Sequence, residues 1–222
     1  MNEIFNQMMS LYRREGADGE RNALYEVMQQ IVLCGLYRGG FFNEAAFYGD
    51  TCLRIFYGLK RYSEDMDFSL LTKNPDFSLE KYFPAIIEEA RLLGRDIVIT
   101  KKDKKNFSRV ESAFLKDNTD VYNLTFATDK TLKIKIEVDI DPPLGFKTEQ
   151  KLLMLPFSFN ARCMVLSDLY AGKMHALVFR QWKNRIKGRD WYDFEWYVRN
   201  RIPLDFKHLQ ERAREFNNIE LS

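Results

Sequence analysis

The residues of this chain best suited to chemistry are two carboxylates separated by one residue, Asp65 and Asp67. Alternate side chains of a strand point the same way, so both carboxylates lie on one face, while Met66 and Phe68 lie on the other. Mg²⁺ prefers carboxylate oxygens and substrate phosphates as ligands. Two such ions can activate an attacking hydroxyl and stabilise the leaving oxygen of a phosphoryl displacement. An isolated pair of this kind is more often a solvated strand face, so other segments have to support the site.

Two segments offer that support. A turn of small residues at Gly49, Asp50 and Thr51 precedes a short predicted helix, and free backbone N–H groups at such a turn bind phosphate. Further on, residues 132–141 alternate between apolar and charged side chains, which predicts a strand with an acidic face. Its carboxylates repel one another, and metal ions or the lysines at the strand's start would offset that repulsion.

The stretch from Phe47 to Leu70 resembles the signature of the AbiEii/AbiGii toxin family of nucleotidyltransferases, a branch of the DNA polymerase beta-like superfamily. The matching residues are Gly49, Thr51, Leu53, Arg54, Tyr57, Ser63, Glu64, Asp65, Asp67 and Phe68. Downstream, the segments AGKMHAL around Lys173 and KGRDWYDF around Asp190 and Asp193 resemble two further motifs of the family. Asp50 departs from the pattern, because the family usually has a second glycine there. Its charge would repel a triphosphate, unless Asp50 caps the following helix.

The resemblance implies a role for each of these positions. Two Mg²⁺ ions would be held by Asp65, Asp67 and a third carboxylate from a neighbouring strand. Asp139 is our first choice for that ligand and Glu137 the second. Nucleotide phosphates would be bound by the turn of Gly49, Asp50 and Thr51, by Arg54, and by Lys173 and Arg189. Either Asp190 or Asp193 would be a catalytic or orienting group.

Composition sets broad limits. The chain has 222 residues, of which 45% are hydrophobic and 30% charged, an ordinary mix for an ordered globular protein. The net charge of +2 favours no nucleic-acid partner by itself. Cys34, Cys52 and Cys163 are predicted to be buried thiols, and two histidines make a zinc site improbable. The sequence contains no signal peptide and no apolar run that could span a bilayer, so we expect a cytoplasmic protein.

The predicted fold class is α/β (α+β), a mixed nucleotidyltransferase-type sheet with flanking helices and a helical C-terminal part. Gly145–Gln150 follows a Pro-Pro pair and is predicted to be a connector. We therefore place a catalytic domain with N-terminal helices at residues 1–148 and a helical domain at residues 149–222. Helices are predicted at 3–14, 20–37, 78–93 and 166–181, the last with Ser167 as N-cap, and strands at 65–70, 97–100, 109–114, 121–128 and 132–141.

The predicted function is transfer of a nucleoside monophosphate from a nucleoside triphosphate to an acceptor hydroxyl. The resemblance implies tRNA or another RNA as acceptor, and a cognate antitoxin protein as partner. The basic run at 180–189, flanked by Trp182 and Trp191, could hold the acceptor or the triphosphate itself. One alternative is an antibiotic-type nucleotidyltransferase with a small-molecule acceptor. Another, suggested by Asp50, is a catalytically silent module that binds a nucleotide or a partner.

Overall fold

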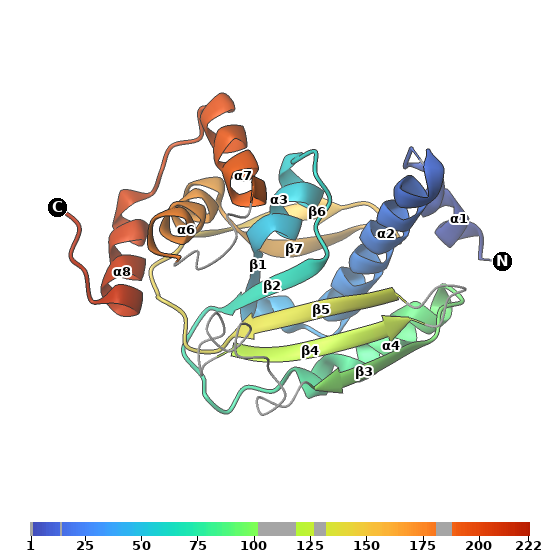
Figure 1. Ribbon diagram of the computed structural model, residues 1–222. Coiled ribbons are helices and arrows are strands. Elements are labelled where there is room, and N and C mark those ends of the chain that lie inside the picture. The colour runs from blue at the N-terminus through green and yellow to red at the C-terminus, as the bar shows by residue number, and fades with distance from the viewer. Residues whose placement is uncertain (1, 14, 102–118, 127–131, 181–187) are drawn as a thin grey trace.

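A computed structural model describes most of the chain, namely residues 2–13, 15–101, 119–126, 132–180 and 188–222. One mixed sheet forms its centre (Figure 1). Helices α2 and α4 lie behind the sheet in this view, whereas α6, α7 and α8 gather at the left. None of the helices in the described ranges is long and apolar enough to cross a membrane.

The described strands form a single seven-stranded sheet. In spatial order they are β3 (Ile97–Lys101), β4 (Thr119–Phe126), β5 (Leu132–Asp139), β2 (Asp65–Leu70), β1 (Ala45–Tyr48), β7 (Phe159–Met164) and β6 (Thr148–Leu153). The pairs β2–β5 and β1–β7 are parallel, and the remaining neighbours are antiparallel. This mixed sheet with its flanking helices confirms the predicted fold class.

The helices follow the apolar periodicities of the sequence, and the glycines at residues 39 and 40 end α2 as expected. They are α1 (Glu3–Ser10), α2 (Gly16–Arg38), η1 (Phe41–Asn43), α3 (Gly49–Tyr57), η2 (Leu79–Tyr82), α4 (Phe83–Leu92), α6 (Leu166–Phe179), α7 (Gly188–Arg199) and α8 (Phe206–Asn217). One expected detail is wrong. Val165, and not Ser167, is the N-cap of α6, because the helix already begins at Leu166.

The core lies between the apolar face of the sheet and the helices behind it. Phe68 of β2 stacks on Phe47 of β1 at 4.9 Å between ring centroids, and Phe41 of η1 meets Phe68 edge-on at 5.0 Å. Such pairs add about 0.5–1.5 kcal/mol each beyond the burial of their area. Gly35 of α2 allows α4 to approach closely, because a Cβ there would lie 2.6 Å from the Cα of Ile86. The face of β2 that carries Phe68 is thus fixed inward, which turns the acidic face outward.

The C-terminal half differs from the prediction in one respect. The stretch expected to be a connector contains the start of β6, and β7 continues the sheet beside β1. The sheet therefore extends to Met164, beyond residue 148, and only the chain from Leu166 onward is helical. The predicted strand at 109–114 lies outside the described residues.

Candidate functional site

The acidic face of β2 lies beside the acidic face of β5. In the parallel register, Asp67 is aligned with Glu137 and Asp65 with Lys135. Asp139 is aligned with Ser69, one pleat further along the strands. The structure thus brings Asp65, Asp67 and Glu137 together. Asp139, the first choice for the third ligand, lies further from the pair than Glu137, the second choice.

Charge is not balanced at this face. Burial raises the pKa of Asp67 well above its ordinary value, and the charges of Glu137 and Asp65 raise it further. Burial also raises the pKa of Asp65, although Lys135 opposes that shift. The ammonium of Lys135 forms an ion pair with Glu137. Three carboxylates therefore share one lysine, and a bound cation would stabilise all three in their charged form.

The turn before α3 brings backbone up to this face. Gly49 has a φ of +78°, a conformation that side chains other than glycine rarely adopt. A Cβ at this position would lie 3.1 Å from Cβ and Cγ of Asp67 and would collide with its carboxylate. Only glycine fits there without moving Asp67. The first N–H groups of α3 consequently start beside the strand carboxylates, where a phosphate could be bound.

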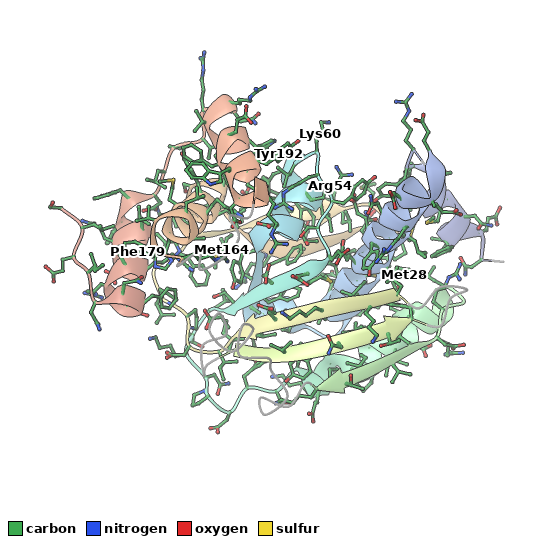
Figure 2. The ribbon with its side chains drawn as sticks, in the orientation of Figure 1. Met28, Arg54, Lys60, Met164, Phe179 and Tyr192 are labelled. Atoms are coloured by element: carbon green, nitrogen blue, oxygen red, sulfur yellow. The ribbon has the colours of Figure 1, made fainter. Side chains whose placement is uncertain are left out.

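Two residues expected to bind nucleotide instead hold the turn in place. Thr51 is buried, and its hydroxyl donates to the backbone carbonyl of Asp65. Arg54 donates from Nε to Glu26 of α2 at 2.7 Å and from Nη1 to the carbonyls of Leu59 and Lys60 at 2.9 Å (Figure 2). The hydroxyl of Thr51 and these nitrogens of Arg54 are therefore already used. Both residues position α3 and the loop that leads to β2, and their contact with phosphate stays a prediction.

A second group of charged residues, which we call the helix network, lies where α3 meets α6 and α7. At its centre is the ammonium of Lys173, which is 2.7 Å from Asp50, 3.0 Å from Asp190 and 2.8 Å from Asp193. The sequence left Asp190 and Asp193 as alternatives, and in the structure the carboxylates of both contact the ammonium of Lys173. The spacing of three residues places them on one side of α7, as expected.

Two arginines complete the helix network. Arg61 donates to Asp193 from Nε at 2.6 Å and to Asp50 from Nη2 at 2.6 Å. Arg180, the residue directly after α6, lies 3.2 Å from Asp190. Sequence reasoning missed Arg61, because it stands in a loop with no periodic pattern and its partners are 11 and 132 residues away.

Asp50 is an integral member of this network. It lies within the first turn of α3 but makes no cap hydrogen bond, so the expectation that it caps the helix is wrong. Although burial alone would raise its pKa, Lys173 and Arg61 hold the pKa of the Asp50 carboxyl well below its usual range. Its charge is therefore compensated. A compensated Asp50 gives no reason of its own to expect a catalytically silent module.

The helix network also has the spacing of a metal site, since carboxylate oxygens of Asp50, Asp190 and Asp193 lie within 4.8 Å of one another. The ammonium of Lys173, however, already contacts all three carboxylates. A metal ion bound there would have to displace that ammonium. The strand face carries excess negative charge and is the better cation site of the two.

The basic run at 180–189 is described only at its ends. Arg180 belongs to the helix network, and Arg189 is exposed at the start of α7. The charge of Arg189 acts on Asp65 and lowers its pKa, which opposes the larger effect of burial. The contact of Arg189 with nucleotide stays a prediction. Trp182 and the other basic residues of the run lie outside the described residues.

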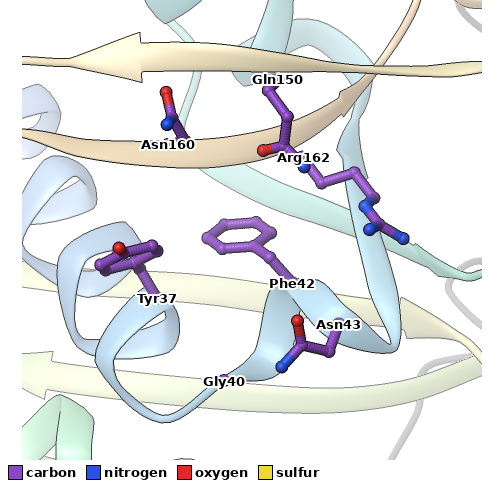
Figure 3. A pocket seen from close by; sticks show the side chains of 7 residues that line it. All are labelled: Tyr37, Gly40, Phe42, Asn43, Gln150, Asn160 and Arg162. Carbon is purple, nitrogen blue, oxygen red and sulfur yellow. The ribbon is translucent and has the colours of Figure 1, made fainter.

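A hollow of about 280 Å³ lies elsewhere, between the end of α2, η1 and the β6–β7 hairpin (Figure 3). Its lining contains none of the residues that the sequence predicts for the site. The lining residues are Tyr37, Gly40, Phe42, Asn43, Gln150, Asn160 and Arg162.

Comparisons with known proteins identify the family and agree with the fold. The family model described as the nucleotidyl transferase AbiEii toxin of type IV toxin–antitoxin systems matches residues 31–220. Among solved structures, MenT4, a nucleotidyltransferase toxin from Mycobacterium tuberculosis H37Rv, gives a TM-score of 0.59 at 17% identity, covering 99% of this chain and 73% of that one. JHP933 from Helicobacter pylori gives a TM-score of 0.55 at 18% identity, covering 90% of this chain and 75% of that one. No curated protein gives a significant match. At these identities the structural likeness concerns the fold alone.

Proposed function

The chain belongs to the AbiEii family of nucleotidyl transferase toxins of type IV toxin–antitoxin systems, and from this premise we propose that it transfers a nucleoside monophosphate from a nucleoside triphosphate to a hydroxyl of an RNA, with tRNA as the first candidate. One observation carries the proposal. The backbone at Gly49 lies directly against a strand face on which three carboxylates share a single lysine. Such a place suits a phosphate and its cations together.

The donor set fits Mg²⁺, which prefers carboxylate oxygens. Asp65 and Asp67 would hold it, and we now favour Glu137 over Asp139 as the third ligand, because Glu137 is aligned with Asp67 and its charge acts strongly on that residue. When bound, the metal lowers the pKa of an attacking hydroxyl and stabilises charge on the leaving oxygen. We propose two ions, one for the attacking oxygen and one for the leaving oxygen.

The reaction is a displacement at the α-phosphorus. The acceptor hydroxyl oxygen forms a bond to the α-phosphorus, its proton passes to a neighbouring carboxylate or to solvent, and the bond to the bridging oxygen of pyrophosphate breaks. The protein's task is to align the two oxygens and to bind charge on the leaving group. In this proposal the N–H groups at the start of α3 and the guanidinium of Arg189 bind that charge.

Without a nucleotide, Lys173 contacts carboxylates, whereas the resemblance implies a contact with nucleotide phosphates. Its ammonium is held by three carboxylates, and these contacts raise its pKa although burial opposes the charge. We propose that Lys173, with Arg61, positions Asp50 and so the Gly49 turn. A direct phosphate contact would require the ammonium to leave Asp50.

The acceptor and the protein partner are inferred from the family. Near Arg189, α7 exposes Trp191, which has 52% of its surface exposed, and Tyr192 at 43%. Exposed aromatic rings beside a guanidinium suit stacking with unpaired bases and contact with phosphate. A cognate antitoxin protein is the expected partner, and a cytoplasmic location is expected with it.

The test is incubation of the protein with Mg²⁺, total bacterial RNA and each of the four α-labelled nucleoside triphosphates. We expect one nucleotide to label a tRNA-sized band with the wild type, and no label with the Asp65→Ala/Asp67→Ala variant. Acceptor binding should weaken steeply with added salt. Absence of transfer to RNA by a folded wild type would contradict the proposal and would favour a small-molecule acceptor.

A further inference from the structure

Helix α8 contains buried polar groups that no family motif explains. His208 and Arg212 are four residues apart and so lie on the same side of the helix. Both ring nitrogens of His208 and Nε of Arg212 are buried, and no described residue forms a hydrogen bond with them. Buried donors are rarely left unpaired, because desolvation without a partner is costly. This side of α8 therefore requires a partner that the described residues do not provide.

Ion pairs join α8 to the end of β5 beside the strand face, because Nζ of Lys73 lies 3.5 Å from Glu215 of α8 and 2.8 Å from Asp141. The side chain of Arg212 interacts electrostatically with Tyr48 and Asp139. Tyr48 is aligned with Asp67 across β1 and β2, and Asp139 is two residues beyond Glu137 on β5. Arg212 thus lies along the edge of the proposed cation site, although it is 147 residues from Asp65 in the sequence.

The guanidinium of Arg212 is held from its own helix. It lies 4.9 Å from the ring centroid of Phe216, one turn further along α8. Among the described residues none forms a hydrogen bond or an ion pair with Arg212, so its planar fork of donors is available. This arrangement fixes the position of the group while leaving its donors free to bind a ligand.

A second arginine, Arg180, directly follows α6, which packs against α8 through His175 and Asn217 at 2.7 Å. The charges of Arg180 and Arg212 repel each other, and this repulsion lowers the pKa of Arg212 in addition to the larger effect of burial. Arg180 has 42% of its side chain exposed and contacts Asp190 through one nitrogen, Nη1. Two guanidinium groups from different helices would be stabilised by an anion bound between them.

We propose that Arg212 binds the β- or γ-phosphate of the nucleoside triphosphate, opposite Arg180, and that α8 is therefore part of the nucleotide site. This inference rests on the proposed function, since it identifies the anion as the triphosphate of that reaction. The guanidinium fork donates two parallel hydrogen bonds to phosphate oxygens. Arg212 then stabilises the charge that pyrophosphate carries as it leaves.

The experiment compares Arg212→Met with Arg214→Met. Arg214 belongs to the same helix, is 59% exposed and pairs only with Glu211 in the described part of the chain, so it is a matched control. In the presence of Mg²⁺, binding of the four nucleoside triphosphates and of the matching monophosphates is measured by calorimetry. We expect Arg212→Met to weaken triphosphate binding roughly tenfold or more, with monophosphate binding changed less than about twofold. Arg214→Met should change neither, and Arg212→Lys should recover part of the loss.

Three results would contradict the proposed contact between Arg212 and the triphosphate. Unchanged triphosphate binding by Arg212→Met, with a lower unfolding temperature, would show that Arg212 only docks α8 against Asp139, and would overturn the inference. Equal weakening of triphosphate and monophosphate binding would also overturn it. If Arg212→Met does not fold, the comparison is made with Arg212→Lys, and a Lys variant indistinguishable from the wild type in triphosphate binding overturns the fork contact. A wild type that binds no triphosphate would instead refute the proposed function, and the inference with it.

Discussion

Two groups of carboxylates lie close together in this protein and differ in how their charge is balanced. The strand face contains Asp65, Asp67 and Glu137, with Lys135 as the single paired cation. The helix network contains Asp50, Asp190 and Asp193, and three cations, Lys173, Arg61 and Arg180, contact them. One group has excess negative charge and the other is neutral.

This difference separates a ligand site from a structural one. Buried charges that serve the fold are matched by fixed partners, because an unmatched buried charge is strongly destabilising. Charges that serve a bound cation have to remain unmatched until the cation arrives. Oxygen spacing alone would select the helix network as the metal site. Charge balance selects the strand face, and the following predictions test that choice.

The largest effect on stability is expected in the helix network. Asp193→Asn removes the carboxylate that pairs with both Arg61 and Lys173, at contacts of 2.6 and 2.8 Å. Although burial raises the pKa of Asp193, its loss leaves three buried or half-buried cations with two carboxylates, and we expect the free energy of unfolding to fall by about 3–5 kcal/mol. Urea denaturation measures this change. Glu195→Gln, in an exposed pair with Arg199 on the same helix, should change it by less than about 1 kcal/mol. Equal effects of the two substitutions would refute a structural role for the network.

The strand face should respond in the opposite way. Asp67→Asn removes a carboxylate that neighbouring carboxylates repel, so the metal-free protein should become more stable. Nucleotidyl transfer should nevertheless fall at least about 100-fold, the effect typical of losing one group that stabilises transition-state charge. Thermal unfolding and the transfer assay measure both quantities. Asp76→Asn, at an exposed acid away from the site, is the control. A less stable Asp67→Asn protein would show that the strand face is compensated after all.

Gly49 lies against Asp67 of the strand face and directly precedes Asp50 of the helix network. Its role can be tested by comparing alanine substitutions at Gly49 and Gly58. Gly49 and Gly58 both have positive φ, 78° and 85°, so alanine at either costs about 1–2 kcal/mol in backbone strain. Only at Gly49 would the added Cβ collide with Asp67, whereas nothing lies within 4 Å of it at Gly58. We expect Gly49→Ala to lose transfer activity and Gly58→Ala to keep it. Equal transfer activities of the two variants would mean that a displacement of Asp67 does not affect catalysis.

A smaller effect is expected in the dependence of stability on pH. Lys173 and Arg61 lower the pKa of Asp50 below the unfolded value of about 4, despite burial, so its stabilising contribution is present above pH 4 and is lost as the pH falls further. The pKa of Asp67 is raised above that value, so the folded state binds the proton first, and metal-free stability increases as the pH falls towards 4.

Denaturant unfolding of Asp50→Asn, Asp67→Asn and the wild type between pH 7 and pH 3 separates these contributions. Asp67→Asn should lose part of the rise in stability on acidification towards pH 4. Asp50→Asn should lose part of the fall below it. The same slope in all three proteins would argue against opposite charge balance in the two groups.

Much of the strand face could be predicted from the sequence, because its signals are local. Alternation over six residues fixed the bounds of β2, and alternation in residues 132–139 fixed the buried face of β5. The choice between Glu137 and Asp139 could not be made, since both lie on one face. It depends on the register between two strands that are about 70 residues apart, and no local pattern encodes that register.

The parts that were missed depend on tertiary contacts. β6 is a polar edge strand whose residues are half-buried or exposed, so it has no strong apolar alternation, and it forms through pairing with β7. Arg61 and Arg212 carry no motif, and their surroundings come from elements distant in sequence. The contacts of Lys173 could not be predicted either. A sequence motif identifies the cation, but it does not show which carboxylates the cation contacts.

The most direct test of the account is Mn²⁺ binding to the wild type, Asp67→Asn and Asp190→Asn, followed by the electron paramagnetic resonance signal of the free ion. We predict that Asp67→Asn abolishes binding at the active site and that Asp190→Asn, where it remains folded, retains it, because the ion binds at the unbalanced strand face. Retention of binding by Asp67→Asn together with its loss in a folded Asp190→Asn protein would place the cation in the helix network and would contradict the account.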